Sequence, residues 1–187
     1  MNPRILIGGI GNVLLGDDAV GPYVVHHLES EYLFGDNVEI ADLGTPALDL
    51  THRIVGLDAV ILVDCIAPCD HPPGTILRFR QEDILRAQPA QRLDPHSPAL
   101  SECLMTVEML GSSPKALLLV GIVGECFEPG RPLSHTIQQA AGKAIDAILV
   151  HLEQLGVQYE KSVSNLAQGM WWCDPDPRRQ LNHDRTP

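Results

Sequence analysis

The stretch ILIGGIGNVLLGDDAVGPYVVHHLE, Ile5–Glu29, changes from one hydrophobic pattern to another across a short turn. It starts with a nearly unbroken apolar run, which is typical of a strand covered on both faces. It ends with Val20, Val24, His27 and Leu28 at helical spacing, which predicts a helix with one buried face. Since parallel sheets are built by repeating such strand–turn–helix units, this stretch decides the expected fold.

The turn inside this stretch raises a question of charge, because glycine-rich turns from strand to helix commonly bind nucleotide phosphates. The segment Gly9–Leu14 begins like a dinucleotide fingerprint but has Leu14 where the third glycine belongs. Asp17 and Asp18 would repel a pyrophosphate, and Asp42 lies slightly too far along the chain to be the acid that binds a ribose. A nucleotide-binding, Rossmann-like protein is therefore the weaker alternative. The turn favours a cation, and its glycines permit close helix packing.

Apolar runs and helical periods alternate along the rest of the chain, which predicts an α/β fold. The expected strands are Ile5–Ile10, Val38–Ala41, Ala59–Val63, Thr75–Phe79 and Ala116–Ile122. The third and fourth of these are too close for a crossover helix, so the fourth is expected as an edge strand that can run antiparallel. The predicted architecture is a three-layer sandwich, a twisted and mainly parallel sheet of about five strands with helices on both faces.

Helices are expected between these strands. The first follows the glycine turn, and apolar residues within 48–54 indicate a second. Ser97 is a suitable N-cap for a third helix that stops at Gly111. Ser134 is a suitable N-cap for the last helix, whose apolar face continues to Leu155.

Chain length and pattern predict one domain with one core. A chain of 187 residues suits a single domain, here assigned to residues 1–155. The hydrophobic pattern fades near Gly156, so residues 156–187 are expected to form a tail that is either mobile or docked.

Composition excludes several classes of protein. The formal net charge is −11 and the pI is near 5.0, which disfavours nucleic acids and anionic membranes as partners. No apolar run approaches the roughly 20 residues that span a bilayer. Asn12 and the two aspartates interrupt the apolar N-terminus, and no signal-peptide cleavage pattern follows. The cysteine count of 5 is odd, which favours free thiols in a reducing compartment and predicts a cytoplasmic protein.

Candidate functional residues gather where the predicted strands end, because ligands of open parallel sheets bind beyond the carboxyl ends of the strands. Asp17 and Asp18 follow the first strand, Asp64 ends the third, and His96 precedes a helix. Two carboxylates and one imidazole suit Ni, Zn, Co or Mn, with positions left open for water or substrate. Adjacent side chains rarely share a target, so at most one of the two neighbouring aspartates should face such a site. Spacing does not say which one.

Each of these residues also has a purely structural explanation. Asp64 can accept backbone N–H bonds and fix the following loop, one of Asp17 and Asp18 can cap the helix, and His96 can be a solvated loop residue. The usual hydrolase motifs, His-Glu-x-x-His and Gly-x-Ser-x-Gly, are missing from the sequence. It is the combination of two acids and one imidazole that favours a site.

Five motifs in register resemble the NiFe-hydrogenase maturation endopeptidases, in an order and spacing that match over about residues 4–155. They are GIGNVLLGDDAVGP (Gly9–Pro22), DLGTPALDL (Asp42–Leu50), ILVDC (Ile61–Cys65), DPHSPAL (Asp94–Leu100) and LVGIVGECFEPG (Leu119–Gly130). The chain departs from the family at two positions, since the first acid is often Glu where Asp18 stands and a glycine often stands at Ala47.

The resemblance implies an activity and a set of site residues. Members of this family cleave once, removing a C-terminal extension from the hydrogenase large-subunit precursor after nickel insertion, and the bound nickel is the recognition signal. Their metal-contacting residues correspond to Asp18, Asp64 and His96, which selects Asp18 over Asp17. The expected protein is a metal-dependent endopeptidase whose nickel arrives with its substrate, although other divalent metals can occupy the site.

A rival from another class fits the same residues. A non-enzymatic, nickel-sensing assembly protein would bind the precursor through the same three ligands and cut nothing. The sequence does not separate the two.

Overall fold

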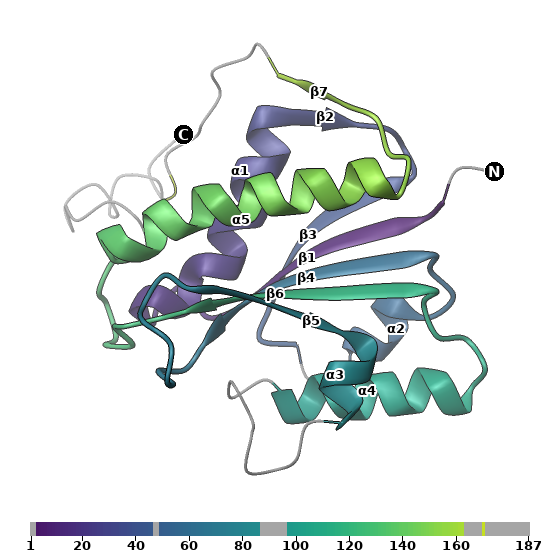
Figure 1. The fold of residues 1–187 in the computed structure, drawn as a ribbon, viewed down its shortest axis with the longest axis horizontal. Helices are drawn as coiled ribbons and strands as arrows, with labels where there is room; N and C mark the ends of the chain where they lie inside the picture. The colour runs from purple at the N-terminus through teal and green to yellow at the C-terminus, as the bar shows by residue number, and fades with distance from the viewer. Residues whose placement is uncertain (1–2, 47–48, 87–96, 163–169, 171–187) are drawn as a thin grey trace, which may run out of the picture.

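The chain folds around one five-stranded sheet. The computed structural model describes residues 3–46, 49–86, 97–162 and Met170 (Figure 1). The strand order is β3-β1-β4-β6-β5, in which the first four strands run parallel and β5 pairs antiparallel with β6 at the edge. The strands are β1 (Ile5–Ile10), β3 (Val38–Gly44), β4 (Ala59–Ile66), β5 (Ile76–Arg80) and β6 (Ala116–Val123).

This sheet confirms the predicted fold class, including the antiparallel edge strand. The main difference lies at the carboxyl ends of the strands. Because Cys65 and Ile66 pair with Ile122 and Val123 of β6, β4 continues past Val63, where the expected strand ended. The expected strand is too short, because a polar residue after an apolar run looks in sequence like the end of a strand.

Helices cover both faces of the sheet. They are the 3-10 helix η1 (Gly16–Ala19), α1 (Val20–Glu31), α2 (Leu50–Ile54), α3 (Gln81–Arg86), α4 (Ser97–Met109) and α5 (His135–Gln154). Ser134 caps α5 as predicted, since its side chain accepts a hydrogen bond from Ile137 N–H. Ser97 is the first residue of α4 rather than its cap. The sequence did not predict α3, because a six-residue helix that buries only Ile84 has no visible period.

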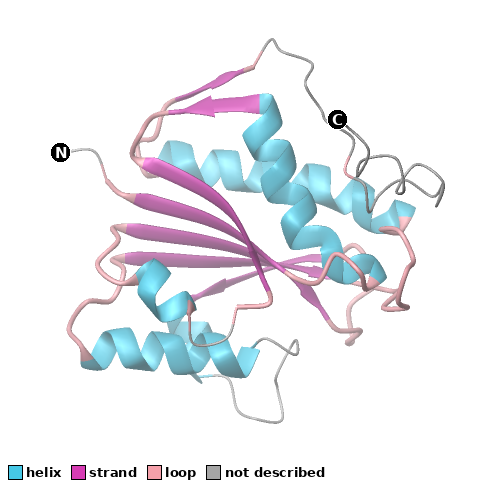
Figure 2. Cartoon of the chain, turned by 180° about the vertical axis from the view of Figure 1, so that it is seen from behind, coloured by secondary structure: helices cyan, strands magenta, loops and turns pink. Residues whose placement is uncertain are grey.

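The helices divide into two layers, with α1 and α5 on one face of the sheet and α2, α3 and α4 on the other (Figures 1 and 2). Side chains alternate along each strand, so each strand serves both layers. In β1, Ile5 and Ile7 pack with α1 and α5, whereas Leu6 packs with α2 and α4. The carboxyl edge of the sheet is therefore enclosed between two helical layers. In the part of the chain that the structure describes, no helix combines the length and the apolar character that crossing a bilayer requires.

A second, two-stranded sheet forms where the sequence suggested none. Strand β2 (Tyr32–Phe34) pairs antiparallel with β7 (Tyr159–Lys161), and the rings of Tyr32, Phe34 and Tyr159 pack together. The beginning of the predicted tail is thus docked beside the end of α1. Residues 163–169 and 171–187 lie outside the described residues, and the domain division at residue 155 stays a prediction.

Glycines bring α1 into backbone contact with the sheet. A methyl group at Gly21 would lie 2.6 Å from Val63 O and would also collide with Ile10 O. Gly11 has a φ of +145°, and a side chain there would run into the carbonyl oxygen of Asp18. The prediction that the glycines serve a tight turn and close packing is therefore confirmed.

We expect Gly11→Ala to destabilise the fold by about 2–4 kcal/mol, because it combines backbone strain with a collision against a main-chain oxygen. Equilibrium denaturation measures this loss. The matched control is Gly142→Ala in α5, where an added Cβ meets nothing within 4 Å. That change should raise stability by about 0.5–1 kcal/mol, since alanine is the better helix former. Equal stability of the two variants would contradict the close-contact explanation.

Candidate functional site

The predicted acids lie on neighbouring elements at the carboxyl edge of the sheet. Asp18 belongs to η1, which follows β1, and Asp64 belongs to the adjacent strand β4. The first turn of α1 lies directly against the carboxyl half of β4, as the close approach of Gly21 to Val63 O shows. This contact brings together the segments that carry Asp18 and Asp64, which are 46 positions apart in the chain (64 minus 18).

Asp18 is 5% exposed, and its carboxylate takes part in the turn itself. Its Oδ2 accepts the N–H of Asn12 at 2.8 Å. The neighbouring N–H groups are also engaged, since Leu14 N–H binds Asn12 Oδ1 and Gly11 N–H binds Gly44 O. In a phosphate-binding turn, such N–H groups point at the ligand. Here protein oxygens accept them, so the turn has no cradle of N–H groups for a pyrophosphate.

Asp64 is 2% exposed and lies inside β4 rather than at its end, where the sequence placed it. Its Cα is paired with Gly121 of β6, and its Oδ1 accepts the N–H of Cys65 at 2.8 Å. By strand alternation it shares the face of Val60 and Leu62, the face that α4 covers. A carboxylate in an otherwise apolar layer is costly unless it is bound by other groups, which is the chemistry of a ligand site.

His96 lies outside the described residues. The structure describes its successor, Ser97, as the first residue of α4. In Figure 1 this end of α4 lies toward the carboxyl ends of the parallel strands. The assignment of His96 as a ligand stays a prediction.

Asp17 has a different role from the helix cap that the sequence suggested. It is 0% exposed, and neither η1 nor α1 has a side-chain cap. Instead, Oδ2 accepts the N–H groups of Glu125 and Cys126, each at 2.9 Å, and Oδ1 accepts Ser134 N–H at 2.7 Å. These partners are more than 100 positions away in the chain, so no local pattern could have revealed them. The two adjacent aspartates thus face different targets, as expected of neighbouring side chains.

Asp42 also makes a local contact in place of a ligand contact. It is exposed, and its Oδ1 accepts Gly44 N–H at 2.8 Å in the turn that ends β3. This is the geometry of an Asx turn. It accounts for the residue without a ribose.

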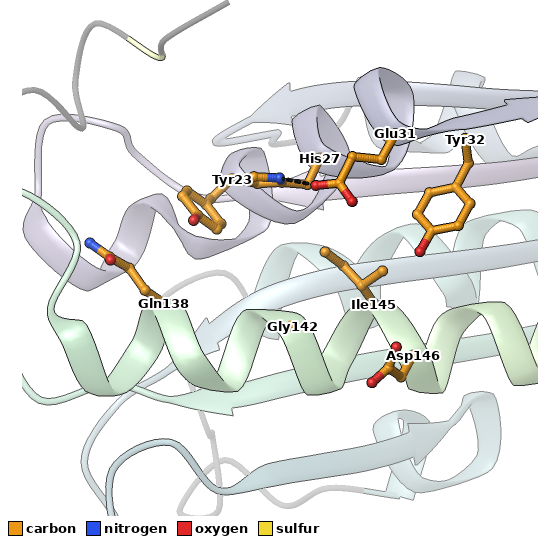
Figure 3. Close-up of a pocket in the computed structure, with 8 residues that line it drawn as sticks. All are labelled: Tyr23, His27, Glu31, Tyr32, Gln138, Gly142, Ile145 and Asp146. Carbon is orange, nitrogen blue, oxygen red and sulfur yellow. Dashed lines mark hydrogen bonds and ion pairs between the residues drawn. The ribbon is translucent and has the colours of Figure 1, made fainter. Parts of the chain in front are cut away.

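A groove of ≈ 310 Å³ lies between α1 and α5 (Figure 3). Within it, His27 Nδ1 and Glu31 Oε1 are 2.8 Å apart. Neither Asp18 nor Asp64 lines this groove. Its lining consists of Tyr23, His27, Glu31, Tyr32, Gln138, Gly142, Ile145 and Asp146.

Comparison with known proteins decides the family. A family model described as HycI, hydrogenase maturation protease, matches residues 22–151. The chain belongs to the hydrogenase maturation protease family. The matched span includes Asp64 and His96 and begins after Asp18.

Relatives and solved structures agree with this family. The hydrogenase 2 maturation protease of Escherichia coli K12 is 35% identical over 155 residues, covering 83% of this chain and 94% of that protein. The hydrogenase expression/formation protein HupD of Thiocapsa roseopersicina is 33% identical, over 83% of this chain and 71% of HupD. The structure of the hydrogenase maturating endopeptidase HybD of E. coli superposes with a TM-score of 0.78 at 33% identity, over 84% of this chain and 97% of HybD.

Family membership fixes the type of reaction. The protease is an endopeptidase, a hydrolase that acts on peptide bonds, which confirms the predicted enzyme class. Within the described ranges, no three His, Cys, Asp or Glu side chains come together as a metal site. The predicted ligand set requires His96 beside Asp18 and Asp64, so it stays a prediction.

Proposed function

We propose that this protease removes the C-terminal extension of a NiFe-hydrogenase large-subunit precursor after nickel insertion and recognises the bound nickel through Asp18, Asp64 and His96. The observation that carries this proposal is the pair of buried carboxylates on adjacent elements at the carboxyl edge of the sheet. Each carboxylate accepts a backbone N–H through one of its oxygens. A cationic group delivered by the substrate would give both of them a role in recognition as well.

The donor set suits nickel that arrives as part of the substrate. Two carboxylates and one imidazole are fewer ligands than a closed metal site contains, so positions remain for the precursor's own ligands. The protease's residues would then orient the precursor, because coordinating its nickel fixes the position of the scissile peptide bond. In this proposal the nickel belongs to the substrate rather than to the resting enzyme.

Peptide hydrolysis requires an activated water and a stabilised carbonyl oxygen, and two routes are consistent with these residues. A bound metal supplies Lewis acidity, which can polarise the carbonyl or activate water. Alternatively, a carboxylate of the site accepts the proton of the attacking water as a general base. In both routes the site positions the scissile bond before the water attacks.

We further propose that this reaction takes place in the cytoplasm. Cys65, Cys69, Cys103 and Cys126 form no disulfide bonds in the part of the chain that the structure describes. Cysteines that are not oxidised to disulfides suit a reducing compartment.

Asp64→Asn and His96→Ala should each abolish processing while the fold persists. Losing a residue that supports a metal ligand typically costs 10- to 100-fold in affinity or activity, so losing a ligand should lower the processing rate at least about 100-fold. The measurement is the shift of nickel-loaded precursor on a denaturing gel, with circular dichroism to check the fold.

The matched controls are Asp36→Asn and His52→Ala, which alter exposed side chains before β3 and within α2. Both should process the precursor at the normal rate. Full processing by the Asp64 and His96 variants would refute the site.

Nickel-free precursor should not be cleaved, because the site would lack the cation that positions the substrate. Incubating the protease with matched nickel-loaded and nickel-free precursor, followed by mass spectrometry of the large subunit, measures this dependence. Efficient cleavage of the nickel-free form would remove nickel recognition from the proposal. Binding of the nickel-loaded form without any cleavage would instead favour the rival, a nickel-sensing assembly protein.

A further inference from the structure

Asp17 lies next to a proposed metal ligand yet directs its carboxylate elsewhere. It is completely buried and accepts three backbone N–H bonds from the segment Glu125–Ser134, which connects β6 to α5. Hydrogen bonds to an ionised group are stronger than neutral ones, and a buried carboxylate persists only when it is bound in this way. Asp17 and this segment therefore form one unit.

The chemistry of these contacts requires a carboxylate. Oδ2 accepts two N–H groups and Oδ1 accepts the third, so both oxygens act as acceptors. An asparagine has one acceptor oxygen and one N–H₂ group, which cannot accept. Asp17→Asn would therefore place donor against donor in at least one contact.

Main-chain contacts also join this turn to the segment Glu125–Ser134. Asp17 N–H donates to Cys126 O at 2.8 Å, and Gly130 N–H donates to Leu14 O at 2.9 Å. A methyl group at Gly16 would lie 2.5 Å from Cys126 O. The turn from Leu14 to Asp17 is thus fastened to the β6–α5 segment at several points immediately before Asp18.

We propose that Asp17 is a positioning residue, which holds Asp18 in place by clamping the turn that carries it to the segment Glu125–Ser134. This inference rests on the proposed function, since it assigns Asp18 to the site. Asp18 is one peptide unit from the clamp, so its backbone direction is set by Asp17. Its Oδ2 accepts the N–H of Asn12, which belongs to the same turn.

The hydrogen-exchange rate of the Asn12 amide separates the two explanations, because a general loss of stability would not raise exchange at this amide in particular. This N–H is donated to Asp18, so its hydrogen exchange reports the position of that carboxylate. Asp17→Asn in the full-length chain should speed exchange at Glu125, Cys126 and Ser134 and also at Asn12. It should lower kcat for nickel-loaded precursor about 10- to 100-fold, the range typical of residues that orient a metal ligand.

The control is a core variant of equal stability. Ile148 is fully buried in α5, so Ile148→Val or Ile148→Ala can be chosen to match the unfolding midpoint of Asp17→Asn. The matched variant should keep slow exchange at Asn12 and normal kcat. The clamp is overturned if Asp17→Asn leaves Asn12 exchange unchanged and processes the precursor as fast as the matched variant.

A second pair of variants tests the clamp without altering Asp17 and decides the case if Asp17→Asn fails to fold. Ser134 has a φ of −64° and a ψ of 152°, which proline adopts, so Ser134→Pro removes the N–H that binds Asp17 Oδ1. Ser134→Ala removes the same helix-capping hydroxyl but keeps that N–H. Faster exchange at Asn12 and lower kcat in the proline variant alone support the clamp, and identical behaviour of the two variants overturns it.

Failure of the proposed function can be told apart from failure of the clamp. Full processing by Asp18→Asn would contradict the proposed site, whereas the exchange of the Asn12 amide would still show whether Asp17 holds the turn. If Asp18→Asn is inactive while Asp17→Asn is fully active, the proposed site is supported and the positioning role of Asp17 is overturned.

Discussion

The backbone of the first turn of α1 touches the backbones of β1 and β4, and the arrangement of the carboxyl edge depends on this contact. Glycines at 9 and 21 make it possible, because a side chain at either position would collide with a main-chain oxygen of the facing element. The contact brings the turn that carries Asp17 and Asp18 against the strand that carries Asp64. A helix separated from the sheet by ordinary side chains would lie farther away, and the turn that carries the two acids would be correspondingly farther from β4.

This contact also explains how a glycine-rich turn of the nucleotide-binding type serves a different chemistry. In such turns the N–H groups at the start of the helix usually bind a phosphate. In this protease the carboxylate of Asp18 accepts the N–H of Asn12, while Asp17 satisfies three N–H groups of a distant segment. The turn therefore carries two acidic side chains of its own, which disfavours a phosphate and is consistent with the proposed cation.

The two neighbouring aspartates have different hydrogen-bond partners. Asp17 is bound entirely by backbone N–H groups and connects the β1–α1 turn to the start of α5. Asp18 remains at the carboxyl edge, beside β4. In the proposed site, Asp17 would hold the ligand Asp18 in place, because metal-dependent chemistry requires ligands that are oriented before the substrate arrives.

The sequence by itself determined the layered α/β fold, the five main strands, the antiparallel edge and the Ser134 cap, because these follow from hydrophobic period and local hydrogen bonding. It also singled out Asp64 and the pair Asp17 and Asp18 as candidates, because acids beside an apolar strand stand out, and the family resemblance selected Asp18 from the pair. Only the tertiary structure decided that Asp64 lies inside β4, that β7 pairs with β2, and that Asp17 binds Ser134. Each of these features depends on partners far away in the chain. Local propensity and hydrophobic periodicity do not indicate which distant N–H group a buried carboxylate will bind.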